Sequence, residues 1–244
     1  ASFAERWMMY MKQVIRIGSV ALLLMCCLLP GLLTTTVSAA NAEIAYPVTG
    51  GNIYFESLGY TSSGNAARVI RCDPEVTEAT IPWEVEISGL HYYVSGIAAS
   101  AFEDCDNLTS VTMEIRRNVA EYRIGTKAFF DCDNLVNVVL PDDYYDGQKY
   151  YGALAIETYA FADCDKLLDV VFPQNATFVR INDYAFQNCD SLASVTLPSS
   201  VSDNINGYPT KSVFSDCDSL TTVVCESSIG SRWFTDCKNL KSVT

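Results

Sequence analysis

An eighteen-residue motif occurs six times between residue 97 and the end of this 244-residue chain, and this repetition constrains the fold more than any other feature. Aligned on its cysteine, the motif reads I-xxx-A-F-xx-C-xx-L-xx-V-x-L-P, and the sixth copy is truncated. The copies begin at Ile97, Ile124, Ile156, Ile181, Pro209 and Ile229. Cysteines of successive copies lie 20 to 32 residues apart, so a fixed core alternates with connectors of variable length. This pattern is typical of stacked coils, in which only the core must match its neighbour.

Each copy combines a strand signal with a compact turn. Its second half, as in "LVNVVLP" and "LASVTLP", alternates β-branched residues and predicts a short strand. Its first half is too short for a stable α-helix and predicts an irregular or 3-10 turn. One copy buries about five apolar side chains, worth roughly 1.5–3 kcal/mol each, whereas ordering its backbone costs roughly 1–2 kcal/mol per residue. A single copy therefore cannot fold alone, and neighbouring copies must stack.

The spacing I-xxx-AF-xx-C-xx-L-xx-V-x-LP resembles the BspA-type leucine-rich repeat of bacterial surface proteins, and the resemblance covers residues 97–244. It implies an α/β solenoid, a right-handed leucine-rich-repeat coil with short parallel strands and irregular or 3-10 convex turns. Residues 43–96, with "GGNIYFESLG" and "ATIPWEVEISGLHYYVSGI", resemble the β-rich N-terminal cap that often precedes such repeats. The fifth copy departs from the pattern at Pro209 and Val213, and the sixth has Trp233 in the alanine position.

The segment 11–42 has the features of a secretory signal peptide. Lys12 and Arg16 precede the apolar run "VALLLMCCLLPGLL", and small residues follow it. Residues 1–10 lie upstream of the expected start, and cleavage is expected after Ala39 or Ala42. An uncleaved anchor is the alternative, although the run is short for a membrane span. The net charge of −13 disfavours nucleic acid and anionic lipid as partners. We therefore expect a secreted or cell-surface protein with no membrane contact after cleavage.

The six motif cysteines and their aromatic neighbours are expected to form the structural repeat core. These residues are Cys105, Cys132, Cys164, Cys189, Cys217 and Cys237, with Phe102, Phe129, Phe161, Phe186, Phe214 and Phe234. Buried thiols fit such a row, because free cysteine behaves as a small apolar side chain. One or more disulfides are the alternative in an exported chain, and only Cys72 lacks a place in the repeat. One thiolate per coil does not converge on zinc, so no metal site or cofactor is expected. The flanking aspartates are interpreted as a solvated turn, with stacked calcium ligands as the alternative.

The sequence favours recognition over catalysis. His91 is the sole histidine, and no nucleophile or metal-binding motif is present, so we do not expect an enzyme. Outward strand residues are small, whereas two connectors are rich in Tyr and Arg, which supply much of the binding energy at interfaces. The expected contact residues are Arg116, Arg117, Tyr122, Tyr144, Tyr145, Tyr150 and Tyr151.

The family resemblance implies adhesion or matrix binding, and the expected partner is an extracellular protein or glycan. The alternatives are a structural spacer and the targeting part of a larger surface enzyme. Because the last copy stops within a strand, we expect either a missing C-terminal continuation or self-association through an open C-terminal edge.

Overall fold

The computed structural model describes residues 43–61, 64–114, 119–142, 152–202, 204–205, 208–227 and 229–244. The chain divides into two units, Ala1–Ala42 and Glu43–Thr244, and the description below concerns the second. The signal-peptide prediction falls on the first unit, outside the described residues.

The second unit begins with a β-rich cap that merges into the repeats. Three antiparallel strands and a hairpin belong to it, with β4 between them. These strands are β1 (Glu43–Val48), β2 (Gly51–Thr61), β3 (Gly64–Cys72), β4 (Glu78–Ile81), β5 (Glu84–Ile87) and β6 (Leu90–Ile97). β3 pairs in parallel with β6, and β6 pairs in parallel with β8 (Glu121–Ile124). β4 pairs in parallel with β7 (Ser110–Met113), the first strand of the repeat region. The cap therefore supplies a strand edge on which the first coil is built.

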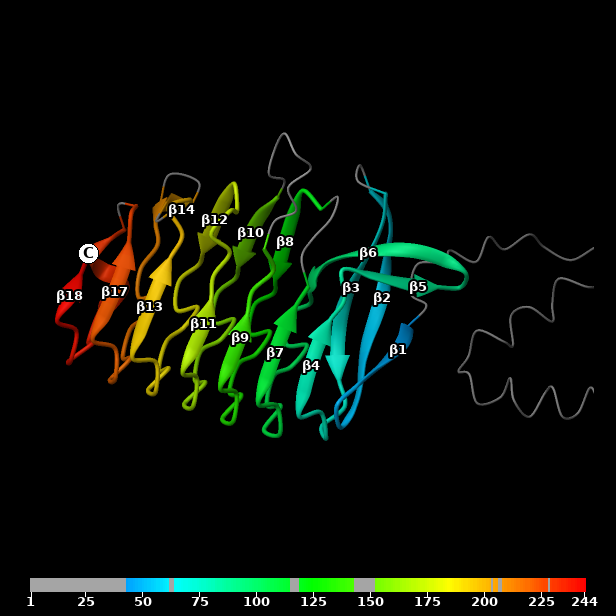
Figure 1. The fold of residues 1–244 in the computed structure, drawn as a ribbon, viewed down its shortest axis with the longest axis horizontal. Helices are drawn as coiled ribbons and strands as arrows, with labels where there is room; N and C mark the ends of the chain where they lie inside the picture. The colour runs from blue at the N-terminus through cyan, green and yellow to red at the C-terminus, as the bar shows by residue number, and fades with distance from the viewer. Residues whose placement is uncertain are drawn as a thin grey trace, which may run out of the picture. The chain divides into compact units, whose positions relative to one another are not determined.

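Each coil contributes one strand to each of two rows (Figure 1). Sheet A continues from the cap in the order β1-β2-β3-β6-β8-β10-β12-β14, with β8 (Glu121–Ile124), β10 (Ala153–Ile156), β12 (Phe178–Ile181) and β14 (Val201–Ser202). Sheet B contains β4, β7 (Ser110–Met113), β9 (Asn137–Val139) and β11 (Asp169–Val171). The same row continues with β13 (Ser194–Leu197), β17 (Thr222–Cys225) and β18 (Ser242–Val243). The remaining elements are the β15 (Asn204–Ile205) and β16 (Tyr208–Pro209) hairpin and a 3-10 helix at Ser231–Phe234.

The fold is a parallel β-solenoid of the leucine-rich-repeat type. The expected α/β class is wrong, and of the two expected forms of the convex turn, irregular or 3-10, the 3-10 form is wrong for the first five copies. The described residues contain no α-helix, and their single 3-10 helix is Ser231–Phe234. The physical reason is that two residues in each of the first five turns have positive φ, which interrupts any right-handed helical run. Successive coils show this at Ser100 and Asp104, Lys127 and Asp131, Tyr159 and Asp163, Tyr184 and Asn188, and Ser212 and Asp216.

The turns also form a hydrogen-bonded row of their own. The amide of Phe129 donates to the carbonyl of Ala160 at 2.8 Å, and the amide of Asp131 donates to the carbonyl of Ala162 at 3.1 Å. Equivalent bonds join the other neighbouring turns. The residue before each motif cysteine has a φ between 55° and 59°. Because Asp and Asn adopt this conformation more readily than most residues, backbone geometry explains the aspartate before the cysteine.

Stacked phenylalanines form the centre of the solenoid. Phe102, Phe129, Phe161, Phe186 and Phe214 are fully buried, and consecutive ring centroids lie 4.7–5.1 Å apart. The last member, Phe234, is half-buried and lies 5.8 Å from Phe214. Trp233 is fully buried in the alanine position of the sixth copy, where its indole N–H donates to the Thr210 hydroxyl at 2.9 Å.

The motif cysteines tie each coil to the one before it. The thiols of Cys132, Cys164, Cys189, Cys217 and Cys237 donate to the carbonyl of the phenylalanine one coil back, at 2.8–3.2 Å. Burial raises the pKa of the Cys164 and Cys189 thiols well above the ordinary value, and that of Cys237 to about 11. Cys105 differs, because it forms a disulfide with Cys72 of the cap. The expectation of a free thiol at Cys105 is therefore wrong: no motif phenylalanine precedes the first coil, and Cys72 is the partner instead.

Candidate recognition surface

The predicted contact residues in the connectors do not form a site in the described part of the chain. Arg116, Arg117, Tyr144, Tyr145, Tyr150 and Tyr151 lie outside the described residues. Tyr122 lies on β8, where Glu121 and Arg123 point outward and Tyr122 alternates with them. Its side chain is only 2% exposed. A surface contact by Tyr122 is therefore the wrong interpretation, because its ring belongs to the interior of the solenoid.

The aspartates of the turns and the sole histidine, His91, were the candidates for chemistry. Among the described residues, no group of three His, Cys, Asp or Glu side chains is placed to hold a metal ion. Burial, together with the negative charge of neighbouring aspartates, raises the pKa of Asp131 and Asp165. His91 lies on the β5–β6 hairpin, where its Nδ1 is 2.8 Å from Oε1 of Glu84. Within the described ranges, no helix is long and apolar enough to cross a bilayer.

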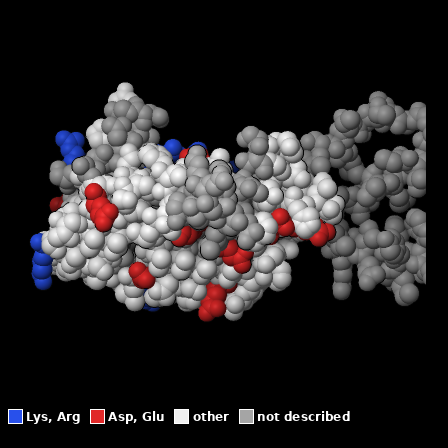
Figure 2. All heavy atoms as spheres, turned by 45° about the horizontal axis from the view of Figure 1, so that its top comes forward, with Lys and Arg blue, Asp and Glu red and all other residues white. Residues whose placement is uncertain are grey.

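The outward face of sheet B is a regular surface of small side chains. In register, one row contains Glu78, Ser110, Asn137 and Asp169, and the next contains Thr80, Thr112, Val139 and Val171. All eight residues are exposed or half-buried, as the alternation in the sequence predicts. Figure 2 shows a mostly uncharged surface with scattered acidic groups, and prominent basic groups at the β18 end. This face presents hydroxyl, amide and methyl groups at the regular spacing of strands.

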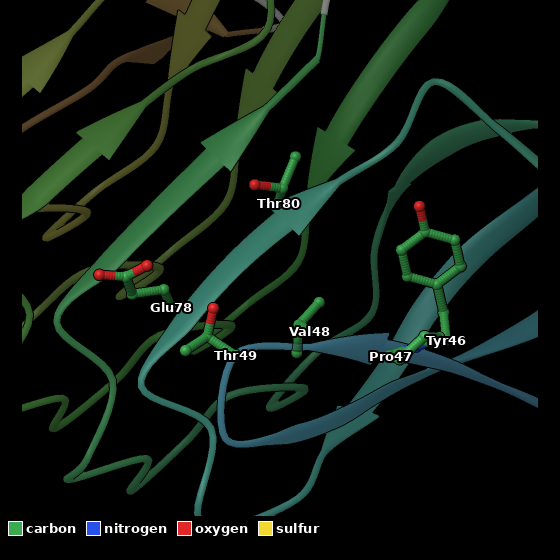
Figure 3. Close-up of a pocket in the computed structure, with 6 residues that line it drawn as sticks. All are labelled: Tyr46, Pro47, Val48, Thr49, Glu78 and Thr80. Carbon is green, nitrogen blue, oxygen red and sulfur yellow. The ribbon is translucent and has the colours of Figure 1, made fainter.

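A groove lies at the cap end of this face, between β1 and β4 (Figure 3). Its volume is about 240 Å³, and it is lined by Tyr46, Pro47, Val48, Thr49, Glu78 and Thr80. An antiparallel bridge between Thr49 and Glu78 joins the β1–β2 turn to β4. The β1–β2 turn passes so close to the backbone at Glu75 that a Cβ on Gly50 would lie 2.2 Å from the carbonyl oxygen of Glu75. Only glycine fits there, and this close approach fixes the wall of the groove.

The groove combines an aromatic ring with polar groups of both kinds. The side chain of Tyr46 is 37% exposed, and its ring meets that of Phe55 edge-on at 5.9 Å, whereas Glu78 is a hydrogen-bond acceptor. The hydroxyls of Thr49 and Thr80 both donate and accept hydrogen bonds. The exposed lining of the groove is mostly polar, and Pro47 and Val48 are its aliphatic members. Sequence reasoning missed the groove because β1 and β4 belong to the cap, which carries no repeat.

Comparison with known proteins places this geometry in a family. Residues 90–151 and 154–244 match the BspA-type leucine-rich repeat region, in six copies. A T. pallidum leucine-rich repeat protein is 24% identical with a TM-score of 0.56, covering 81% of this chain and 80% of its own. A Bacteroides ovatus leucine-rich repeat protein is 23% identical with a TM-score of 0.54, covering 83% of this chain and 45% of its own.

A leucine-rich cell surface protein of Faecalibacterium prausnitzii is also similar in structure. It is 23% identical with a TM-score of 0.52, and the alignment covers 84% of this chain and 55% of that protein. This chain thus spans about half the length of the last two structures, and these likenesses show the fold. No protein with a curated function matches the sequence. The family match covers more than half of the residues and confirms the resemblance read from the motif: the chain belongs to the BspA-type leucine-rich repeat family.

Proposed function

We propose that the chain is a non-catalytic recognition module that acts at the cell surface and binds an extracellular protein or glycan. The observation that carries the proposal is the groove of Tyr46, Glu78 and Thr80, which opens onto the outward face of sheet B. The groove supplies an aromatic ring and a carboxylate at one end of a row of small side chains. An extended ligand anchored in the groove would lie along that row without steric obstruction from large side chains.

The family supports this proposal in two ways. Stacked repeats create a long, regular surface, and proteins built in this way commonly use it for recognition. The similar Faecalibacterium prausnitzii protein is described as a cell surface protein. Surface location also suits the apolar, signal-like segment in residues 11–42.

Binding arrays of glycans and matrix proteins test the proposal when wild type is compared with a groove variant. Tyr46→Ala combined with Glu78→Gln is expected to weaken binding at least tenfold, because exposed aromatic anchors contribute about 1–2 kcal/mol or more. Tyr208→Ala is the matched control, since Tyr208 is 77% exposed on the separate β15–β16 hairpin. Equal binding by wild type and the groove variant would refute the groove as the contact site.

The connector tyrosines are a second part of the proposal and need their own variant. Replacing Tyr144, Tyr145, Tyr150 and Tyr151 with Ala tests whether that connector contacts the same ligand. If wild type binds nothing on either array, the structural-spacer and targeting-module alternatives gain support. The coverage of about half of two similar structures favours testing them within a longer chain.

A further inference from the structure

The groove between β1 and β4 exposes the backbone edge of sheet B. β4 is the terminal strand of the order β11-β9-β7-β4, and its ladder partner is β7. The carbonyl of Ile81 accepts a hydrogen bond from the amide of Glu114, which directly follows β7, at 3.0 Å. Backbone groups of successive residues in a strand point to opposite edges. The N–H and C=O of the exposed residue Thr80 therefore point away from β7, to the side of the groove.

The edge of β4 already accepts a strand partner at one end. An isolated antiparallel bridge joins Thr49 to Glu78, and the amide of Thr77 donates to the Thr49 carbonyl at 2.9 Å. Beyond this bridge, β1 pairs with β2 and diverges from β4 (Figure 3). Within the described ranges, no hydrogen bond joins Thr80 to β1. The pairing that begins at Glu78 thus stops before the next residue that faces the groove, and the donor and acceptor of Thr80 stay open.

Pro47 explains why β1 does not continue this pairing. In the register of the bridge, Pro47 would lie opposite Thr80. Its partner on β2 is Asn52, whose N–H donates to Asp73 Oδ2 at 3.0 Å and whose carbonyl accepts from the Asp73 amide at 2.8 Å. Because the backbone of Asn52 faces away from β1, that of Pro47 faces the free edge, where it offers a carbonyl and no N–H. β1 therefore has no donor for the carbonyl of Thr80.

We infer that an extended peptide with a basic side chain binds in the groove and pairs with Thr80 as the next strand of sheet B. This inference rests on the proposed function and names the class of partner. A peptide supplies N–H and C=O groups at the spacing of a strand, which a glycan does not. Among the described residues, Glu78 makes no ion pair, and it is exposed beside Thr80 on the same face. Together with the net charge of −13, this carboxylate favours a lysine or arginine on the peptide.

A second copy of the chain fits the groove less well than a single peptide. β1 stands beside the open edge of β4, and the β4 edge of another copy has its own β1 in the same place. Two such edges would bring the two β1 strands together before the backbones could pair. An isolated extended segment is only one strand wide and has no such flank.

The test selects peptides and then removes their backbone donors. Phage that display random linear peptides of about ten residues, the length of a long strand, are selected on wild type, and the enriched peptides are synthesised. Each peptide is also made in two forms with N-methyl groups on alternate residues, one form for each edge. N-methylation removes the N–H groups of one edge and leaves the side chains unchanged. Binding is measured by isothermal titration calorimetry, and amide exchange of Thr80 by NMR.

Two proline variants locate the paired edge on the protein. Thr80→Pro removes the open N–H of β4 and leaves the ladder with β7 intact, because that N–H faces the groove. Ala45→Pro is the matched control, since Ala45 is exposed and lies two residues before Pro47 on the same free edge of β1. Glu78→Gln tests the charge. Melting temperatures establish that each variant is folded, and the N-methylated peptides test the pairing on the unaltered protein.

Wild type is expected to enrich peptides with Lys or Arg and to bind them with Kd below about 100 μM, with slower exchange of the Thr80 amide. Thr80→Pro and one of the two N-methylated forms should each weaken binding about tenfold or more, because a ring or a methyl group replaces a donor. Ala45→Pro should bind as wild type does. Glu78→Gln should weaken binding about threefold, as expected for one exposed charge pair.

Four results would each overturn the inference: no enriched peptide, equal binding of the parent peptide and both N-methylated forms, a loss with Ala45→Pro but not with Thr80→Pro, or a wild-type dimer that Thr80→Pro dissociates. The proposed function is judged separately, by the Tyr46→Ala/Glu78→Gln variant on the glycan and matrix-protein arrays. If that variant loses an array ligand while the peptide results fail, the groove recognises a different class of ligand. If neither arrays nor peptides depend on the groove, both proposals fall.

Discussion

Replacing a central member of the phenylalanine stack tests how strongly the coils depend on one another. Phe161 is fully buried and stacks with Phe129 at 4.9 Å and with Phe186 at 5.1 Å. Phe161→Ala removes the burial of a large side chain and two ring contacts, each worth about 0.5–1.5 kcal/mol, and leaves a cavity. We expect a loss of about 4–5 kcal/mol in the free energy of unfolding. Phe234→Ala removes a half-buried ring at 5.8 Å from its neighbour and should cost about 1–2 kcal/mol.

Urea unfolding followed by far-UV circular dichroism measures both losses under the same conditions. Because stability in a repeat protein depends on contacts between nearest neighbours, Phe161→Ala should also broaden the transition as the two halves uncouple. Equal losses for Phe161→Ala and Phe234→Ala, or a loss below about 2 kcal/mol for Phe161→Ala, would refute a continuous apolar interior.

Three further predictions concern the thiols, the aspartate turns and a close backbone approach. In denaturant without reductant, iodoacetamide should modify Cys132 and the five free cysteines that follow it, but neither Cys72 nor Cys105. Peptide mapping by mass spectrometry checks this result, and modification of Cys72 or Cys105 would contradict the disulfide. The pKa of Asp131 is raised by burial and by neighbouring carboxylates, so its contribution to stability is lost as pH rises through the folded-state pKa. Asp131→Asn should therefore raise the melting temperature at pH 7 and leave it unchanged near pH 3, and an equal shift at both values would contradict this account. Gly96→Ala should lower the free energy of unfolding by about 1–3 kcal/mol, because its Cβ would lie 2.2 Å from the Arg123 carbonyl oxygen. An unchanged urea midpoint would contradict this prediction, because it would mean that the backbone shifts at little energetic cost.

The repeat core could be predicted from the sequence because its period is strict. The phenylalanine, cysteine and leucine positions recur at constant spacing, and stacking is the one arrangement that buries them all. The second strand of each coil was missed because it lies in the connectors, whose lengths differ. The segments "EYRI" and "FVRI" alternate between exposed or half-buried and buried residues, and both of them and "ALAI" end on the isoleucine that begins the next copy, so a signal was present. The same alternation places Tyr122 inward, two residues before the buried Ile124.

Features that depend on contacts outside the repeat could not be predicted. The aspartate before each cysteine suggested a solvated turn, but its amide donates to the next coil from a left-handed conformation, which only coordinates show. The pairing of Cys72 with Cys105 joins the cap to the first coil, and no periodicity relates these two positions. The groove beside Tyr46 likewise depends on how β1 crosses the end of sheet B.

Hydrogen exchange of the turn amides tests most directly whether the motif ties the coils together. Phe129, Asp131, Phe161 and Asp163 donate across coils, so their amides should exchange as slowly as those of β9 and β11, and in the same cooperative step. Rapid exchange at these turns beside protected strands would contradict the account, because the turns would then be ordinary surface loops.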